Sequence, residues 1–346
     1  MIRFLWILLI LHHMIIPADA MEFTAPPVPE KGIAYMPSEI DSFGNGLWSI
    51  MKYAISQLHP EITEAAEICL SVVAVVLLTA LLKNMHGSAE QMTDLVGAIT
   101  IGILFLKPAH SLIALGIETI QTMYDYGKLL LPVMTSALAA QGGITSSAAL
   151  FVGTSIFCSV LVGLITNFLV PLLYIHIVMS IINCALKEEL IHKLRDFIKW
   201  ALTWSLKIIL YVFTGYMTIT GVITGTADAS AIRAAKLTLS GVVPMVGNIL
   251  SDASETILIS ASMMKNSVGI YGILALLAVC IGPFVHIGCQ YLMTKITGAV
   301  CSVLGASKSS GLVEDISKAM GMLLAMTGTV CFLLLIGTVC FMRGVT

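Results

Sequence analysis

The chain alternates between long apolar runs and shorter segments that hold most of its charge. The apolar runs cover residues 65–82, 95–106, 148–186, 200–225, 268–293 and 319–342. A helix needs about 20 apolar residues to cross the roughly 30 Å hydrocarbon core of a bilayer, so most of these runs predict a membrane span. The run 95–106 is marginal, and Lys107-Pro108 is expected to end or kink it.

Two segments, 109–147 and 226–266, mix charge with apolar residues at helical spacing. In the first, apolar positions between Ile113 and Tyr124 oppose Glu118 and Gln121, and LLLPVMTSALAAQGG follows. This pattern predicts a helix lying in the membrane interface and then a broken or re-entrant helix. Whether the two segments cross the membrane decides between six and eight spans.

The densest run of charge is KEELIHKLRDFIK, residues 187–199. Its apolar residues fall on one helical face and its charged residues on the other, which predicts an amphipathic helix lying at a membrane surface. Four of its residues are Lys or Arg, so the positive-inside bias places it in the cytoplasm. The segments 21–64, 109–147 and 226–266 then lie outside.

The N-terminus has the pattern of a signal peptide. Residues 1–20 hold one basic residue, an apolar run, Pro17 and a small-x-small site that ends at Ala20, which predicts cleavage there. An uncleaved first helix is the alternative. Residues 21–64 are expected to form an extracytoplasmic arm, flexible near its prolines and helical later, and too short for a core of its own.

Proline spacing suggests an internal duplication. Pro132 and Pro244 are 112 residues apart, and so are Pro171 and Pro283, with the same order of apolar and polar stretches between them. Both units leave and return on the cytoplasmic side, which favours parallel repeats. The predicted fold is all-α, a polytopic integral membrane helical bundle with a parallel repeat, in which 65–186 and 200–346 are the two halves and 187–199 joins them.

Composition narrows the class of protein. The chain is 58% hydrophobic and 11% charged, with a mean hydropathy of +0.96, whereas soluble domains are about 25% charged. A net charge of -2 without a basic cluster argues against nucleic acid as a partner. The eight cysteines lie in apolar runs without CxxC pairs, so we expect small core residues rather than disulfides or metal ligands.

Enzyme signatures are missing from the sequence. It has no GxxxxGK[ST] loop, HExxH helix or GxSxG elbow. Seven carboxylates are all expected at surfaces: Glu188, Glu189, Asp196, Asp252, Glu255, Glu314 and Asp315. We therefore expect no enzyme activity, no cofactor and no metal, and energy supplied by a gradient or a partner.

Polar residues inside apolar runs are functional candidates because burying them in hydrocarbon is unfavourable. They are Asn167, His176, Lys207 and His286. Each histidine is interpreted either as hydrogen-bonded to a carbonyl that a nearby proline frees or as part of a proton relay. Lys207 either extends its side chain to the interface or couples transport.

Breaks in the apolar pattern mark candidate pore or hinge positions, since irregular backbone at membrane depth is tolerated where it lines water or is buried in protein. These positions are Pro132, Gly142, Gly143, Pro171, Pro244, Gly247 and Pro283. Small residues at four-residue spacing, such as Gly321, Ala325 and Thr329, predict close helix packing.

Four features together carry a family resemblance. They are the signal with its exported arm, the paired LLLPVMTSALAAQGG and GVVPMVGNILSDASETIL segments, the stretch FLVPLLYIHIVMSIINCALKEELIHKLRDFIKWALTW, and GPFVHIGCQYLMTKITGAVCSVLG. With these, the chain resembles the stage III sporulation protein AE family of endospore-forming bacteria from about Ile55 to Phe341. No catalytic motif anchors the resemblance.

The resemblance implies a subunit of the channel, often called a feeding tube, that joins mother cell and forespore. The expected location is the mother-cell membrane around the forespore. The expected partners are other stage III sporulation membrane subunits, ring subunits, an ATPase that resembles secretion motors, and a forespore protein, besides the lipid bilayer. The family supplies no catalytic residues.

Three functions follow as alternatives. The first is a channel subunit in which the Pro132 and Pro244 segments line or gate a conduit. The second is a self-contained secondary transporter of a small solute that uses His176, His286 or Lys207 for coupling. The third is a passive scaffold without a pore of its own.

Overall fold

The computed structural model describes residues 24–37, 42–85, 90–186, 189–242 and 247–343. Within these ranges the side chains of 83–85, 90, 91, 186, 221–242, 247–261, 264 and 307 are not described. The described residues form helices and no β-strand. The helices are α2 (Glu30–Ile33), α3 (Phe43–Ser56), α4 (Leu58–Met85), α5 (Glu90–Ala140), α6 (Ile144–Leu164), the π-turn η2 (Ile165–Leu169), α7 (Val170–Leu186), α8 (Glu189–Val242), α9 (Gly247–Val303) and α10 (Ser307–Arg343).

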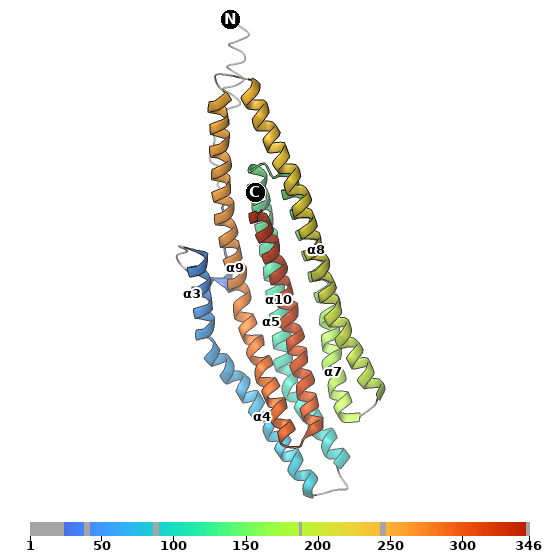
Figure 1. The fold of residues 1–346 in the computed structure, drawn as a ribbon. Helices are drawn as coiled ribbons and strands as arrows, with labels where there is room; N and C mark the ends of the chain where they lie inside the picture. The colour runs from blue at the N-terminus through green and yellow to red at the C-terminus, as the bar shows by residue number, and fades with distance from the viewer. Residues whose placement is uncertain (1–23, 38–41, 86–89, 187–188, 243–246, 344–346) are drawn as a thin grey trace.

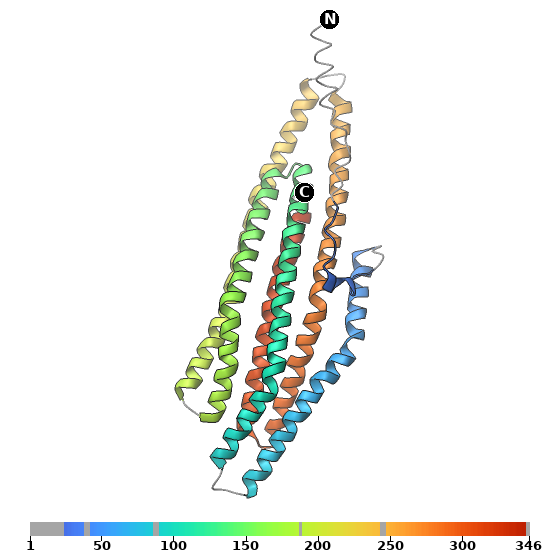
Figure 2. The same cartoon turned by 180° about the vertical axis from the view of Figure 1, so that it is seen from behind.

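The long helices run up and down along one axis (Figure 1). The end of α4, the start of α5, the end of α7, the start of α8 and the α9–α10 turn lie at the lower end. The α5–α6 turn, the end of α8, the start of α9 and the end of α10 lie toward the upper end (Figures 1 and 2). The described residues contain six helical segments long and apolar enough to cross a membrane. The prediction of an all-α polytopic membrane bundle is therefore confirmed.

Helix α5 corrects the predicted organisation of 109–147. It is one helix of 51 residues that continues through Pro108 and Pro132, about 76 Å long against a bilayer core of about 30 Å. The predicted end or kink at Lys107-Pro108 is not a helix end, and the interfacial and re-entrant pieces are wrong. Burial of Ile113 and Ile120 against the bundle holds the helix together across the prolines.

The chain reverses at Gly142 instead. Gly142 has a φ of 89°, the left-handed region that glycine enters without strain. The N–H of Gly143 donates to the Leu138 carbonyl at 3.1 Å, and the N–H of Gly142 donates to the Ala139 carbonyl at 2.9 Å. These two backbone hydrogen bonds cap the C-terminal end of α5, and α6 begins directly after the turn.

The basic segment 187–199 is also corrected. From Glu189 onward it is the first part of α8, which continues without interruption to Val242, so a separate surface helix is wrong. Ile198, Leu202 and Leu206 are buried and pack α8 against the bundle across the predicted boundary. The cytoplasmic location of this end stays a prediction.

The interior is filled by large apolar side chains. Ile113, Ile120, Met123, Met134 and Leu138 of α5 are fully buried, which confirms the predicted apolar face of this stretch. Seven of the eight cysteines are buried and all are free, as expected for small core residues.

The structure does not show the internal repeat. With a shift of 112 residues, Ala140 at the end of α5 pairs with Asp252, which lies inside α9. The turns of the two halves therefore do not coincide, and the repeat stays a prediction. Residues 1–20 and Pro244 lie outside the described residues, so signal-peptide cleavage is also still a prediction.

Candidate functional site

The lower part of the bundle holds an ion pair between helices. Arg195 of α8 places its Nη1 2.5 Å from Oδ2 of Asp315 on α10. The two side chains are 12% and 8% exposed. A buried pair of this kind is sensitive to the loss of either partner, because the remaining charge is left uncompensated.

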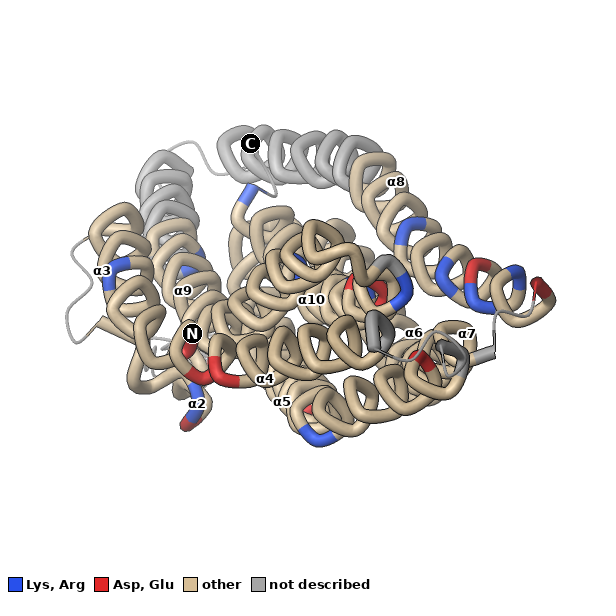
Figure 3. The backbone as a smooth tube through the Cα atoms, turned by 90° about the horizontal axis from the view of Figure 1, so that it is seen from below, with Lys and Arg blue, Asp and Glu red and all other residues tan. Residues whose placement is uncertain are grey.

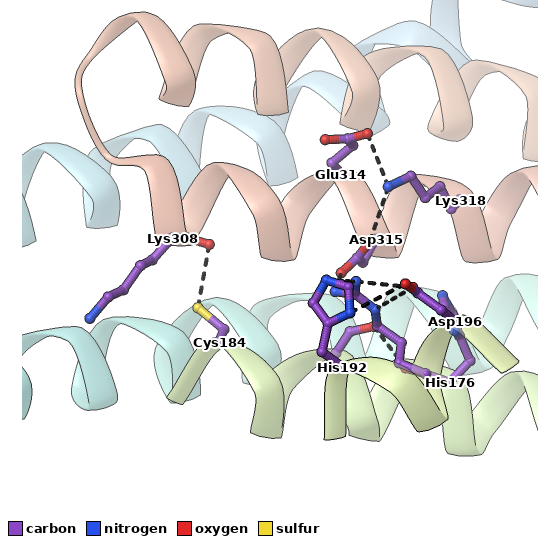
Figure 4. Close-up of polar contacts among 10 residues, drawn as sticks. His176, Cys184, His192, Asp196, Lys308, Glu314, Asp315 and Lys318 are labelled. Atoms are coloured by element: carbon purple, nitrogen blue, oxygen red, sulfur yellow. Dashed lines mark hydrogen bonds and ion pairs between the residues drawn. The ribbon is translucent and has the colours of Figure 1, made fainter. Parts of the chain in front are cut away.

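Further charged groups extend this pair into a network. Lys318 lies 3.0 Å from Glu314 and 3.2 Å from Asp315. On α8, Arg195 also contacts Asp196 at 3.1 Å and His192 at 3.2 Å. Figure 4 shows these groups converging from α8 and α10, and Figure 3 shows charged positions on both helices. We call Arg195, Asp196, Glu314, Asp315 and Lys318 the α8–α10 charge network.

His176 of α7 lies beside this network (Figure 4). It is 1% exposed, and neither ring nitrogen has a hydrogen-bond partner among the described residues. The predicted hydrogen bond to a carbonyl freed by a proline is therefore not formed. His176 is packed close to charge but is not connected by hydrogen bonds to a relay.

A second ion pair lies nearer the lower end. Lys308 of α10 pairs with Asp94 of α5, whose side chain is buried. Cys184 of α7 donates to the backbone carbonyl of Lys308 at 3.4 Å. These contacts join α5, α7 and α10 at the turn that opens α10.

Sequence reasoning missed these ion pairs and placed Asp315 at a surface, which is wrong. Asp315 lies on the face of α10 that carries the buried Leu312, Ile316 and Ala319. The sequence did contain an indication of this burial, because Asp315 is spaced three or four residues from apolar residues that share one face of the helix. Its partner is 120 residues away, so the pair itself had no local signal.

The large exposed side chains of α8 are mostly apolar, although its first turns also expose Glu189, Lys193 and Asp196. Its large exposed residues recur at helical spacing, and we call them the α8 apolar face: Leu190, Leu194, Phe197, Trp200, Trp204, Ile208, Tyr211, Val212 and Ile219. The charged side chain of Arg195 points into the bundle instead. From Trp200 upward the exposed face of this helix is thus more apolar than that of a soluble protein, although Lys207 is exposed there as well.

The outward face of α5 changes character along its length. Below Lys107 it exposes Val96, Ile99, Ile103 and Leu106. Above Lys107 most of its exposed residues are polar, with Ala114 and Leu129 exposed among them, and we call the following set the α5 polar stripe: Ser111, Glu118, Gln121, Asp125, Lys128, Pro132 and Ser136. The stripe is about 38 Å long.

The N-terminal arm reaches this stripe. Lys31 of α2 lies 2.5 Å from Glu118, and Gly32 packs against Val279 of α9. The arm is therefore packed on the bundle between 24 and 37 rather than free. The predicted helical part is α3, which begins at Phe43 and is capped by Ser42, whose Oγ accepts from the N–H of Asn45.

The α5 polar stripe and the α8 apolar face lie at the same level of the bundle. Both helices contact α10, and these contacts show at two positions along the bundle axis which residues of α5 and α8 lie at the same level. Lys207 of α8 lines a groove with Ala325, and Gly116 of α5 packs on Leu323.

Higher up, the Tyr216 hydroxyl of α8 donates to the Ala149 carbonyl at 3.1 Å, and its ring packs on Gly153 of α6. Thr154 packs on Gly337 of α10, and Leu334 packs on Gly127 of α5. Between these heights α5 exposes Glu118 to Lys128, while α8 exposes Ile208 to Val212.

The proposed pore and hinge positions are not brought together into one site. Pro132 lies exposed on the α5 polar stripe, and Gly142 and Gly143 form the α5–α6 turn. Pro171 follows η2, whose wider turn accommodates the missing N–H of proline. In η2, Asn167 Nδ2 donates to the Gly163 carbonyl at 3.0 Å.

The remaining prolines and glycines are separate from that turn. Pro283 lies inside α9, which continues through it. Gly247 is the first residue of α9, and Pro244 lies outside the described residues.

His286 has a side-chain partner rather than a freed carbonyl. It forms an ion pair with Glu61 of α4. Glu61, Glu64 and His286 each offer one ligand atom, and these atoms lie within 4.8 Å of one another. This group could hold a divalent cation by its donor types, although the carboxylates are close enough to the histidine to satisfy it directly.

Six membrane-length helical segments among the described residues, with ion pairs held between them, define a polytopic helical membrane protein. The family model for Stage III sporulation protein AE matches residues 39–344, and the chain belongs to this family. It is also 25% identical over 286 residues to Stage III sporulation protein AE of Bacillus subtilis (strain 168), covering 81% of this chain and 71% of that relative. No solved structure matches the chain.

Proposed function

We propose that the protein is a membrane subunit of the channel complex between mother cell and forespore, and that it helps to form or gate a conduit. Its partners in this proposal are the other stage III sporulation membrane subunits, ring subunits, an ATPase subunit and a forespore protein. It lies in the mother-cell membrane and performs no catalysis of its own. Membership of the stage III sporulation protein AE family supports the sporulation role.

One observation carries the channel role. At one level of the bundle the outward face of α5 is polar and that of α8 is apolar. Lipid around the whole bundle would leave the exposed Lys31–Glu118 and Lys128–Asp125 ion pairs in hydrocarbon, which is unfavourable even for paired charges. Water around the whole bundle would leave a large apolar face exposed. At least one of the two faces therefore needs a partner or an aqueous lining.

We assign lipid to α8 and water to α5. Trp200 and Trp204 on the α8 apolar face are side chains that prefer the membrane interface. The bundle interior between the helices is filled by side chains such as Met123 and Met134, so the conduit would run along the α5 polar stripe, between this chain and other subunits or copies.

Thiol labelling in sporulating cells tests the proposal. Gln121→Cys in a cysteine-free chain is labelled with a membrane-impermeant thiol reagent, with and without the companion subunits, and Ile208→Cys serves as the lipid-facing control. A conduit lining predicts labelling of position 121 in both backgrounds and little labelling of position 208. A bulky reagent at position 121 should also reduce late forespore gene expression.

Other outcomes would select another function. Protection of position 121 only when the companions are present would make the stripe a dry subunit interface and favour the scaffold. Solute uptake by the purified protein alone in vesicles would favour the self-contained transporter.

A further inference from the structure

A groove opens on the surface of the bundle between α8, α9 and α10, with a volume of about 420 Å³. One wall is α8 from Lys199 to Leu210, and the other is α10 from Lys318 to Thr329. Tyr291 of α9 lies at the end near Lys318. Nothing in the proposed channel role uses this groove.

The groove is rich in positive charge, from Lys199 and Lys318 at its lower end to Lys207 about 12 Å higher along α8. Lys199, Lys207 and Lys318 line it, and Lys295 donates to the Tyr291 hydroxyl at 3.3 Å. Among the residues that the structure describes, Lys199 and Lys207 form no ion pair. Lys318 is matched by Glu314 and Asp315, and Asp315 is shared with Arg195. The groove therefore has an excess of cations over carboxylates.

Aromatic residues place this end near the membrane interface. Trp200 follows Lys199 directly, and Trp204 lies one turn further along α8. Their rings are 6.3 Å apart, and Phe197 stacks on Trp200 at 5.9 Å. Tryptophan concentrates where headgroups meet acyl chains, so Lys199 and Lys207 lie at the depth of lipid phosphates and just below it.

The upper part of the groove is apolar apart from Lys207, which lies between Leu206 and Leu210 on α8. Leu206 and Leu210 line it from α8, and Met322 lines it from α10. Gly321 packs closely on Tyr291 of α9, as expected for a small residue, whereas Ala325 lines the groove. A cationic end and an apolar end in one groove match the two parts of a phospholipid.

We propose that this groove binds an anionic phospholipid, with the phosphate among Lys199, Lys207 and Lys318 and an acyl chain along Leu206, Leu210 and Met322. Basic pockets between transmembrane helices are suited to anionic headgroups. Three ammonium groups and the Tyr291 hydroxyl supply donors for phosphate oxygens. The lipid comes from the leaflet on the side where α8 begins, which the positive-inside bias predicts to be cytoplasmic.

Native mass spectrometry of the full chain in detergent tests this site. The probes are phosphatidylglycerol and phosphatidylcholine with matched acyl chains. We expect retention of phosphatidylglycerol in preference to phosphatidylcholine. Lys199→Gln and Lys207→Gln should each weaken phosphatidylglycerol binding about fivefold, and the double variant about 25-fold, from the contribution of one cation near a membrane surface.

Matched variants separate the groove from general charge. Lys193→Gln removes a lysine of the same helix that pairs with Glu189 outside the groove, and it should leave lipid binding unchanged. Lys207→Arg keeps the charge and should retain most of the affinity. Circular dichroism of each variant checks that the helices are intact.

Three results would overturn the proposal. Equal retention of phosphatidylcholine would show that charge does not select the ligand. Unchanged binding in the folded double variant would place the lipid elsewhere. Displacement of phosphatidylglycerol by excess inorganic phosphate would make the groove a site for a soluble anion instead of a lipid.

Discussion

Helices α5 and α8 are both amphipathic, and they turn opposite faces to the outside. Helix α5 buries Ile113, Ile120 and Met123 and exposes the α5 polar stripe. Helix α8 exposes the α8 apolar face and turns Arg195 toward Asp315 inside the bundle. An amphipathic pattern therefore predicts that a segment is helical, but it does not predict which face packs against the bundle. The surrounding medium, lipid or water, decides which face is outside.

The comparison also explains why ion pairs of similar composition contribute differently to stability. The Arg195–Asp315 pair is shielded from solvent between two helices, whereas the Lys31–Glu118 pair lies on the outside, with Glu118 62% exposed. A charge that is shielded from solvent depends on its ion-pair partner for stabilisation, whereas an exposed charge is stabilised mainly by hydration.

The largest expected effect comes from the inward face of α8. Arg195→Ala leaves Asp315 buried without its main partner and should lower the free energy of unfolding by about 3–5 kcal/mol. Denaturant unfolding of the purified protein in mixed micelles measures this. Lys193→Ala on the outer side of the same helix is the control and should change stability by less than about 1 kcal/mol.

The pair also has a replacement test. Arg195→Met combined with Asp315→Leu removes both charges and should recover most of the stability, since apolar residues can replace a buried pair. Equal stability of the Arg195→Ala and Lys193→Ala variants would contradict an inward-facing Arg195.

The buried face of α5 should give the next largest effect. Ile120→Ala removes a fully buried side chain and should lower the free energy of unfolding by about 2–5 kcal/mol. Leu194→Ala on the α8 apolar face removes a side chain that is already outside, with a change within about 0.5 kcal/mol. Comparable losses at the two positions would mean that Leu194 is packed inside the protein, which would contradict the outward orientation of the α8 apolar face.

A charge on each outward face separates lipid from water. Ile208→Lys puts an ammonium group on the α8 apolar face and should disfavour membrane insertion by about 2.5–3.5 kcal/mol at membrane depth. Gln121→Lys on the α5 polar stripe should be tolerated within about 0.5 kcal/mol. The inserted fraction in an in vitro translation and insertion assay reports both, and tolerance of Ile208→Lys would place α8 in water.

The smallest effect concerns the arm. Glu118→Gln removes the partner of Lys31 and should change stability by about 0.2–1 kcal/mol, less at high salt, because the pair is exposed. Gly32 still packs on Val279, so limited proteolysis should show an arm that remains protected. Release of the arm by this single change would show that the ion pair, and not packing, holds it.

The sequence predicted where the helices lie along the chain better than it predicted their ends and which of their faces is buried. Local periodicity identified the apolar face around Ile120 and the apolar runs of the six membrane-length segments. It failed at Pro108, where proline signals a helix end locally but tertiary packing carried α5 through. It also failed at residues 187–199, where it predicted a separate surface helix and did not find that Arg195, unlike the exposed Glu189 and Lys193, turns into the bundle.

The candidate site was predicted less well than the fold. Arg195 and Asp315 meet across 120 residues of chain, and no local pattern encodes such a pair. His176 was identified from the cost of a polar group in an apolar run, but its neighbours come from α8 and α10 (Figure 4). Lys207 was also identified as a candidate from its place in an apolar run, but the groove that it lines is completed by α10, which is distant in the sequence.

Site-directed spin labelling tests the contrast between α5 and α8 most directly. Nitroxides at positions 121 and 125 of α5 and at 208 and 211 of α8 are compared in proteoliposomes, using oxygen as the lipid-soluble relaxant and a nickel chelate as the water-soluble one. We predict that the α5 positions collide mainly with the nickel chelate and the α8 positions mainly with oxygen. The reverse pattern, or the same pattern on both helices, would contradict the assignment of water to α5 and lipid to α8.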